Sequence, residues 1–246
     1  MFSINRGAIN QKWVFTLALI VLAGVIVGGF LLYRVYFSSA TRNRKVFEFL
    51  RNPDLYGDVI TLALTRCDEA PFLMPTSGLI GFLWGDSFRP GHRHQGIDIF
   101  GSNKVGETPV YAVYDGFLSR LPDWKSTVII RIPSDPLQPG RQIWTYYTHM
   151  ADQNGRSLIV DSFPAGSSEV FVSAGTLLGH QGNYSGNPDN PTGVHLHFSI
   201  VVDDGQGCYK NELKIDNTLD PSPYFGLPLN GYSNKNGIPL CEQTYE

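Results

Sequence analysis

The apolar positions form two kinds of helical pattern in the first part of the chain. Residues 13–33 are an uninterrupted, charge-free apolar run of 21 residues, long enough for a helix to cross a bilayer core of about 30 Å. In residues 41–66, apolar side chains recur at three- and four-residue spacing on both sides of Asn52-Pro53-Asp54. This spacing predicts two short amphipathic helices, with Asp54 as the cap of the second. Packing on the following domain is favoured over a position at the membrane surface or pairing with another chain.

The rest of the chain carries the pattern of β-strands. Five runs are rich in valine, isoleucine, tyrosine and phenylalanine, and clusters of glycine, proline, aspartate and asparagine separate them. β-Branched and aromatic side chains favour strands, whereas those clusters favour turns. We therefore expect a mostly antiparallel β-domain with strands at residues 110–120, 127–132, 142–149, 170–172 and 194–202.

Side chains alternate between the two faces of a strand. In strand 194–202 this alternation puts His195 and His197 on one face, and in strand 142–149 it puts His149 opposite Trp144 and Tyr146. We expect His149 to meet the paired histidines if the two strands are neighbours. The predicted core positions of the later strand are Val194, Leu196, Phe198 and Ile200, and the positions predicted to share a face with His149 are Ile143, Thr145 and Tyr147.

Most of the histidine side chains are concentrated in a few short segments. Four of the six histidines lie in His94-x-x-x-Asp98, Thr148-His149-Met150 and His195-x-His197. A zinc ion that activates water takes about three protein ligands from neutral imidazole and carboxylate and keeps one position open. His94, Asp98 and one of the paired histidines supply such a set. His180 is predicted to be structural, and so is His92, although His92 competes with His94 as a ligand.

Three motifs together resemble those of the LytM/lysostaphin-type zinc metallopeptidases, the M23 family. They are His94-Gln95-Gly96-Ile97-Asp98, Tyr147-Thr148-His149-Met150 and Gly193-Val194-His195-Leu196-His197-Phe198, and their order and spacing agree with the family. The resemblance covers roughly residues 72–227, including a strand-and-turn segment at 108–116.

This resemblance implies an antiparallel β-sheet groove that holds one Zn²⁺ ion through His94, Asp98 and His197. It also implies that His149 and His195 are catalytic histidines beside the metal. One would act as the general base and the other would donate a hydrogen bond to the developing oxyanion, and the sequence does not assign these two roles to one histidine or the other. The implied substrates are peptide bonds in peptidoglycan. The polar segment 182–193 is expected to wall the groove; it is longer than the family's usual segment and has Val194 in place of a proline.

The apolar run at residues 13–33 predicts a membrane anchor. A cleaved signal peptide is the alternative, because Ser38-Ser39-Ala40 suits a cleavage site, but the apolar core exceeds the 7–15 residues usual for one. Basic residues are more numerous after the run than before it. By the positive-inside rule alone, the part of the chain after the run would lie in the cytoplasm. The resemblance to the peptidases instead places that part outside the cytoplasm. The expected organisation is a cytoplasmic tail at 1–12, an anchor at 13–33, a helical juxtamembrane linker at 34–71, the peptidase-like domain at 72–227 and a tail at 228–246.

Composition and cysteine content exclude some functions. A net charge of −3 and the lack of a basic run in the domain argue against nucleic-acid binding. None of Cys67, Cys208 and Cys241 lies in a motif, which argues against a zinc–thiolate site or a catalytic cysteine. In an oxidising compartment one disulfide is expected, and a bond that involves Cys241 is favoured among the three pairings. Nothing in the sequence indicates an oligomeric state.

The sequence therefore predicts a membrane-anchored, extracytoplasmic zinc endopeptidase that acts on peptidoglycan. One alternative is a non-catalytic M23-like module that binds the wall or activates an amidase. A second is a non-haem iron oxygenase, whose facial triad also uses two histidines and one carboxylate.

Overall fold

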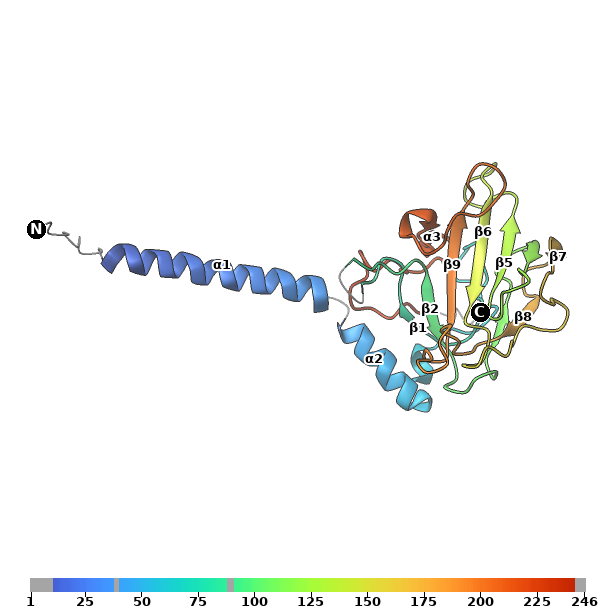
Figure 1. The fold of residues 1–246 in the computed structure, drawn as a ribbon, viewed down its shortest axis with the longest axis horizontal. Helices are drawn as coiled ribbons and strands as arrows, with labels where there is room; N and C mark the ends of the chain where they lie inside the picture. Colours follow the sequence, from blue (N-terminus) through green and yellow to red (C-terminus); the bar gives the residue numbers. More distant parts are fainter. Residues whose placement is uncertain (1–10, 38–39, 88–90, 242–246) are drawn as a thin grey trace, which may run out of the picture. The chain divides into compact units, whose positions relative to one another are not determined.

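The computed structural model describes residues 11–37, 40–87 and 91–241 (Figure 1). The chain divides into two compact units, Met1–Ser38 and Ser39–Glu246. Helix α1 (Gln11–Phe37) lies in the first unit, and its stretch Lys12–Leu32 is apolar, unburied and long enough to cross a membrane. This stretch coincides with the predicted anchor, and a signal sequence near the N-terminus passes the same test of length and composition.

The second unit begins with two consecutive helices, as the spacing in 41–66 predicts. They are α2 (Ala40–Arg51) and a 3₁₀ helix, η1 (Pro53–Val59). The prediction that Asp54 caps the second helix was wrong, because Asn52 is the N-cap and Pro53 begins the helix; proline suits a first helical position, where its missing N–H is not needed. Helix α2 packs through Val46 and Phe49 on the β-sheet, as expected.

An antiparallel sheet of eight strands forms the body of this unit, which confirms the predicted fold class. The order is β1-β2-β9-β6-β5-β4-β7, with β10 paired to β9, and β3 and β8 form a separate two-stranded sheet. Figure 1 shows β2, β9, β6 and β5 side by side. The strands are β1 (Leu79–Phe82), β2 (Ile97–Phe100), β3 (Pro109–Tyr111), β4 (Gly116–Ser119), β5 (Val128–Ile132), β6 (Ile143–Thr148), β7 (Val170–Val172), β8 (Leu177–His180), β9 (Leu196–Val202) and β10 (Thr218–Leu219); η2 (Ile215–Asn217) and α3 (Ser222–Phe225) complete the elements.

The predicted strand 110–120 is two strands in different sheets. Between them the backbone leaves the ladder, because Ala112 bonds to Gly175 and Thr176 while the carbonyl of Val113 accepts from Leu73. A continuous apolar run does not reveal such a change of partner. The sequence reading also missed β1, β2, β8 and β10, which are four residues or shorter.

The core lies under one face of the large sheet. On β9, Leu196, Phe198 and Ile200 are fully buried, and Val194, two residues before the strand, is nearly so, as predicted. Tyr147 of β6 packs against Phe198, and its hydroxyl accepts a hydrogen bond from the backbone N–H of Val113.

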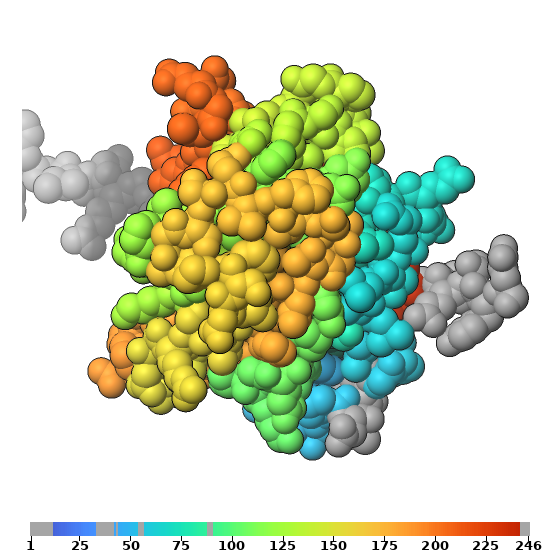
Figure 2. All heavy atoms as spheres, turned by 90° about the vertical axis from the view of Figure 1, so that its right-hand side faces the viewer, coloured from blue at the N-terminus to red at the C-terminus, as the bar shows by residue number. Residues whose placement is uncertain are grey.

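One disulfide joins the segment between η1 and β1 to the end of the described chain. It links Cys67 to Cys241, one of the pairings that involve Cys241, and leaves Cys208 free and exposed. The bond closes a large loop of chain that contains all three motifs. Figure 2 shows the β7 edge of the unit, where the surface is built mostly from the middle of the sequence, coloured green to orange.

Candidate metal centre

Three adjacent strands bring the three motifs together. Strand β9 lies between β2 and β6, and the register pairs His197 with Asp98 on one side and with Thr148 on the other. The close approach of β2 to β9 explains the glycine within the first motif. A Cβ on Gly96 would lie only 2.0 Å from the carbonyl oxygen of Phe198.

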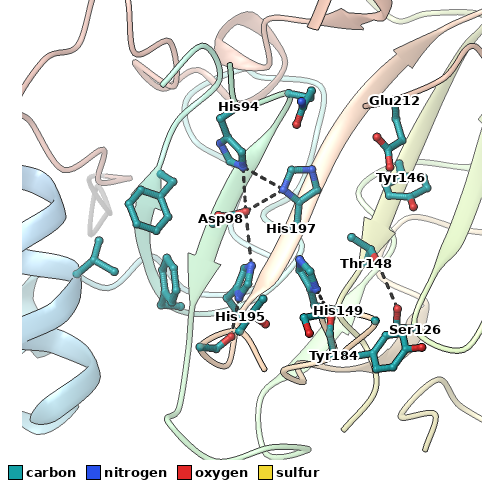
Figure 3. Close-up of a pocket in the computed structure, with 18 of the residues that line it drawn as sticks. His94, Asp98, Ser126, Tyr146, Thr148, His149, Tyr184, His195, His197 and Glu212 are labelled. Atoms are coloured by element: carbon teal, nitrogen blue, oxygen red, sulfur yellow. Dashed lines mark hydrogen bonds and ion pairs between the residues drawn. The ribbon is translucent and has the colours of Figure 1, made fainter. Parts of the chain in front are cut away.

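His94, Asp98 and His197 converge on one point (Figure 3). The oxygen Oδ1 of Asp98 lies 3.1 Å from Nε2 of His94 and 2.8 Å from Nδ1 of His197. The two ring nitrogens are 3.0 Å apart. Tetrahedral zinc with bonds of about 2.0–2.1 Å separates its ligand atoms by about 3.3 Å, so this triangle of donor atoms fits a zinc ion after a small expansion.

A chain of hydrogen bonds fixes the His94 ring on the side that faces away from the cluster. Its Nδ1–H donates to the carbonyl oxygen of Leu83 at 3.0 Å, which leaves Nε2 to face the cluster. The backbone N–H of Leu83 in turn donates to the carboxylate of Asp86. Both oxygens of that carboxylate bind the fully buried guanidinium of Arg42, which belongs to α2. Partners of this kind orient a metal ligand and fix its tautomer.

His149 and His195 stand beside the cluster, and both rings have the same tautomer. The Nδ1–H of His149 donates to the carbonyl of Tyr184 at 2.6 Å, and that of His195 donates to the carbonyl of Gly193 at 2.7 Å. Each Nε2 therefore carries a lone pair. The ring centroids are 4.4 Å apart, and Nε2 of His195 lies 3.7 Å from Oδ1 of Asp98.

The predicted face of His149 was wrong, although its ring does reach the paired histidines. The positions predicted to share its face point into the core, since Thr145 and Tyr147 are fully buried. His149 follows the last residue of β6 and has a φ of 71°, a left-handed conformation. This turn breaks the alternation and brings the ring to the face of Tyr146 and Thr148.

Burial and mutual charge determine the proton states of the cluster in the metal-free protein. Burial lowers the pKa of His195 to about 4 and also lowers the pKa values of His149 and His197. Burial on its own would raise the pKa of Asp98, but the charges of His94 and His195 hold it well below its usual range. His94 is the exception, because Asp98 raises its pKa against the effect of burial. At neutral pH His149, His195 and His197 are therefore neutral.

The cluster lies in a groove of about 680 Å³. The segment 182–193 lines it through Tyr184, Ser185 and Gly186, as predicted for a groove wall. The sequence reading missed two further contributions to the lining. Helix α2 and its neighbours form one apolar side of the groove, and a segment after β9 contributes Glu212. Neither segment has a sequence motif, because only the tertiary structure brings it to the groove. The apolar side consists of Val46, Phe47, Leu50, Phe82 and Phe100.

The two histidines predicted to be structural lie outside the ligand cluster. His92 lines the groove but is not one of the three converging residues, and His180 is the last residue of β8 in the other sheet. Competition of His92 with His94 for the metal is thus not supported by this geometry.

Comparison with known proteins identifies similar solved structures only. No family model and no curated protein matches the chain. The catalytic domain of the antimicrobial peptidase lysostaphin from Staphylococcus simulans is 20% identical, with 59% of this chain and 90% of that chain covered and a TM-score of 0.39. Whole lysostaphin is 21% identical over 64% of this chain and 53% of its own length, with a TM-score of 0.39, so the match spans about half of it. A putative peptidase M23 from Pseudomonas aeruginosa is 18% identical over 76% and 61%, with a TM-score of 0.37.

These proteins include the peptidases that the three motifs resemble. Because the identities are near 20% and the TM-scores lie below 0.5, we draw the functional proposal from the side chains of the site.

Proposed function

We propose that this chain is a membrane-anchored zinc metalloendopeptidase that hydrolyses peptide bonds in peptidoglycan outside the cytoplasm. The observation that carries the proposal is the convergence of His94, Asp98 and His197 beside two further histidines with defined tautomers. The complete set of five side chains favours an enzyme over a non-catalytic module of the same fold.

The donor set suits zinc, since it combines two imidazole nitrogens with one carboxylate oxygen. Zinc bound there lowers the pKa of a coordinated water and polarises a substrate carbonyl. Asp98 supplies a negative charge for the divalent cation, which the imidazole ligands, bound through neutral rings, do not provide. Leu83 and Asp86 keep Nε2 of His94 directed at the cluster.

His149 and His195 supply the proton transfers. Each presents an unprotonated Nε2, because each Nδ1–H is held by a backbone carbonyl. A ring in this state accepts a proton from the attacking water as a general base. Once protonated, it becomes a donor that stabilises negative charge on the carbonyl oxygen or protonates the leaving amine.

Two features support the substrate and the location. The groove is lined by many separate segments of the chain, from α2 to the segment after β9, and such a broad lining suits a polymer strand. The apolar stretch of α1 supports anchoring through residues 13–33, and the wall peptides that the motif resemblance implies lie outside the cytoplasm.

The test is digestion of purified peptidoglycan by the full-length protein in detergent. We expect release of fragments with new amino groups, loss of release with a chelator, and recovery with Zn²⁺. His195→Ala should lower the rate about 100-fold or more, while the control His180→Ala, on β8, should leave the rate unchanged.

Two outcomes would contradict this proposal. Binding of peptidoglycan without release of fragments would identify a non-catalytic module. Recovery of activity by Fe²⁺ but not by Zn²⁺ would indicate the chemistry of a non-haem iron site instead.

A further inference from the structure

The groove has a second carboxylate, at a distance from the apolar side formed by α2. Glu212 lies in the segment between β9 and η2 and lines the groove beside Tyr146 and Leu213. Figure 3 shows Glu212 next to Tyr146, both on the opposite side of the site from α2. Among the lining residues that the structure describes, Asp98 is the other carboxylate, and it belongs to the metal cluster.

Hydrogen bonds on both sides of Glu212 fix its position. The side-chain amide of Gln95, the neighbour of His94, donates to the carbonyl of Leu213 at 2.9 Å. The backbone N–H of Leu213 donates to the side chain of Asn211 at 2.9 Å, and Asn217 donates to the backbone carbonyl of Asn211 at 2.8 Å. The segment that carries Glu212 is thus tied directly to the first ligand motif.

Glu212 is partly withdrawn from water without a cationic partner. Burial raises the pKa of its carboxyl group, which the Tyr146 hydroxyl opposes by hydrogen bonding. In the described part of the chain, Glu212 forms no ion pair with a lysine or arginine, and no lysine or arginine lines the groove. A partly desolvated carboxylate with one phenol partner retains free acceptor positions, so an incoming cation gains a charge-assisted hydrogen bond.

We propose that Glu212, supported by Tyr146, forms a subsite that binds a primary ammonium group of the substrate peptide. The inference rests on the proposed function and assigns a specificity to one side of the same groove. The apolar side at α2 offers no partner for a cation, so the ammonium-bearing part of the peptide lies toward β6. The ammonium group comes either from the side chain of a diamino residue or from a free peptide N-terminus.

Matched peptides distinguish these two sources. The set consists of one cleavable peptide with a lysine next to the scissile bond and versions acetylated at the side-chain amine, at the α-amine, or at both. For the wild-type protein we expect kcat/KM to fall about tenfold when the amine that Glu212 binds is acetylated, mainly because KM rises. This is the size of effect expected when one hydrogen bond to a charged group is lost.

The variants test whether Glu212 causes this preference. Glu212→Gln keeps the shape and removes the charge, so it should cleave the free and acetylated peptides equally well, with kcat largely retained. The matched control is Asp216→Asn, which removes one charge from an exposed position in the adjoining helix η2 and should keep the wild-type preference. Tyr146→Phe should reduce the preference in part.

A binding measurement separates this inference from the proposed function. Calorimetry with the full-length, chelator-treated protein and the uncleaved peptides should show about tenfold weaker binding for Glu212→Gln than for the wild type, and only for peptides with the free amine. Equal preference in wild type and Glu212→Gln, in either assay, would overturn the subsite. If no peptide is cleaved but the binding difference is present, the proposed hydrolysis fails while the subsite stands.

Discussion

His149 shows how a single residue can depart from the pattern of its strand. The motif resemblance places it in the site, but alternation along β6 predicts the wrong face, because the chain turns at His149 itself through a positive φ. A positive φ is uncommon in any residue other than glycine, so only the fold shows it. The ligands were easier to predict, since Asp98 and His197 lie within regular strands and are paired across them. Their roles as ligands, and the catalytic roles of His149 and His195, remain predictions.

The buried histidines should make the metal-free protein sensitive to acid. An unfolded histidine binds a proton near pH 6.5, whereas burial lowers the pKa of His195 to about 4 in the folded protein. Between pH 6.5 and pH 4 the unfolded state therefore binds one proton more than the folded state. The contribution of neutral His195 to the free energy of unfolding is present in full above pH 6.5 and is lost as the pH falls toward 4. Urea unfolding in the presence of a chelator measures this effect. Between pH 7 and pH 5, the free energy of unfolding should fall by about 2 kcal/mol less in His195→Gln than in the wild type.

The comparison isolates His195 because the other cluster residues are present in both proteins. His94, whose pKa Asp98 raises against burial, acts in the opposite direction and contributes to both curves. An equally steep loss of stability in the variant would show that His195 is not the group responsible.

At the scale of elements, α2 is more than a connection. Its Arg42 donates to Asp86, to the carbonyl of Gly81 and to the carbonyl of Asn234, so one buried guanidinium joins α2 to the hairpin that holds His94 and to the C-terminal segment. The amphipathic spacing predicted a packed helix here. It did not predict this ion pair, because Arg42 looks in sequence like one of several basic residues on a polar face.

Removal of Arg42 should be strongly destabilising. Arg42→Ala leaves the carboxylate of Asp86 buried without its partner, which typically costs about 3–5 kcal/mol. It should also weaken zinc binding, since Asp86 supports the Leu83 backbone that holds His94. Urea unfolding and zinc titration measure the two effects.

Arg44→Ala is the matched control, because Arg44 forms an exposed ion pair with Glu48 on the same helix. Pairs of this kind contribute less than about 1 kcal/mol. If Arg42→Ala proves no more destabilising than Arg44→Ala, the buried ion pair does not have the role described.

The strands show where sequence patterns suffice. The runs at β5, β6, β7 and β9 agree closely with prediction because each is a uniform apolar or alternating stretch bounded by turn residues. Strand β2 was missed because Ile97–Phe100 is short and includes Asp98, which reads as a ligand rather than a strand residue. Such a segment is extended mainly because its neighbours pair with it, which is information that the local sequence lacks.

At the scale of the whole molecule, the disulfide ties the segment before the first strand to the end of the described chain. Cys67 and Cys241 are 174 residues apart in sequence. Sequence reasoning limited the choice to three pairings, and only the fold shows which two cysteines meet. Replacing Cys67 and Cys241 by serine should lower the free energy of unfolding by about 2–5 kcal/mol, measured by urea unfolding, whereas Cys208→Ser should change it by less than about 0.5 kcal/mol.

Cys208 also provides a test of the location of the second unit, because its thiol is free and exposed. A membrane-impermeant maleimide applied to intact cells that express the full chain should label Cys208 if this unit lies outside the cytoplasm. The Cys208→Ser variant is the control and should not be labelled. Labelling only after the cells are lysed would place the unit in the cytoplasm and contradict the proposed topology.

The central claim is that three side chains from neighbouring strands hold one zinc ion, and metal analysis of the purified full-length protein tests it most directly. The account predicts about one zinc per chain in the wild type and in His195→Ala, and almost none in His94→Ala, Asp98→Ala and His197→Ala. Full zinc content in all three ligand variants, or a different metal in the wild type, would contradict it.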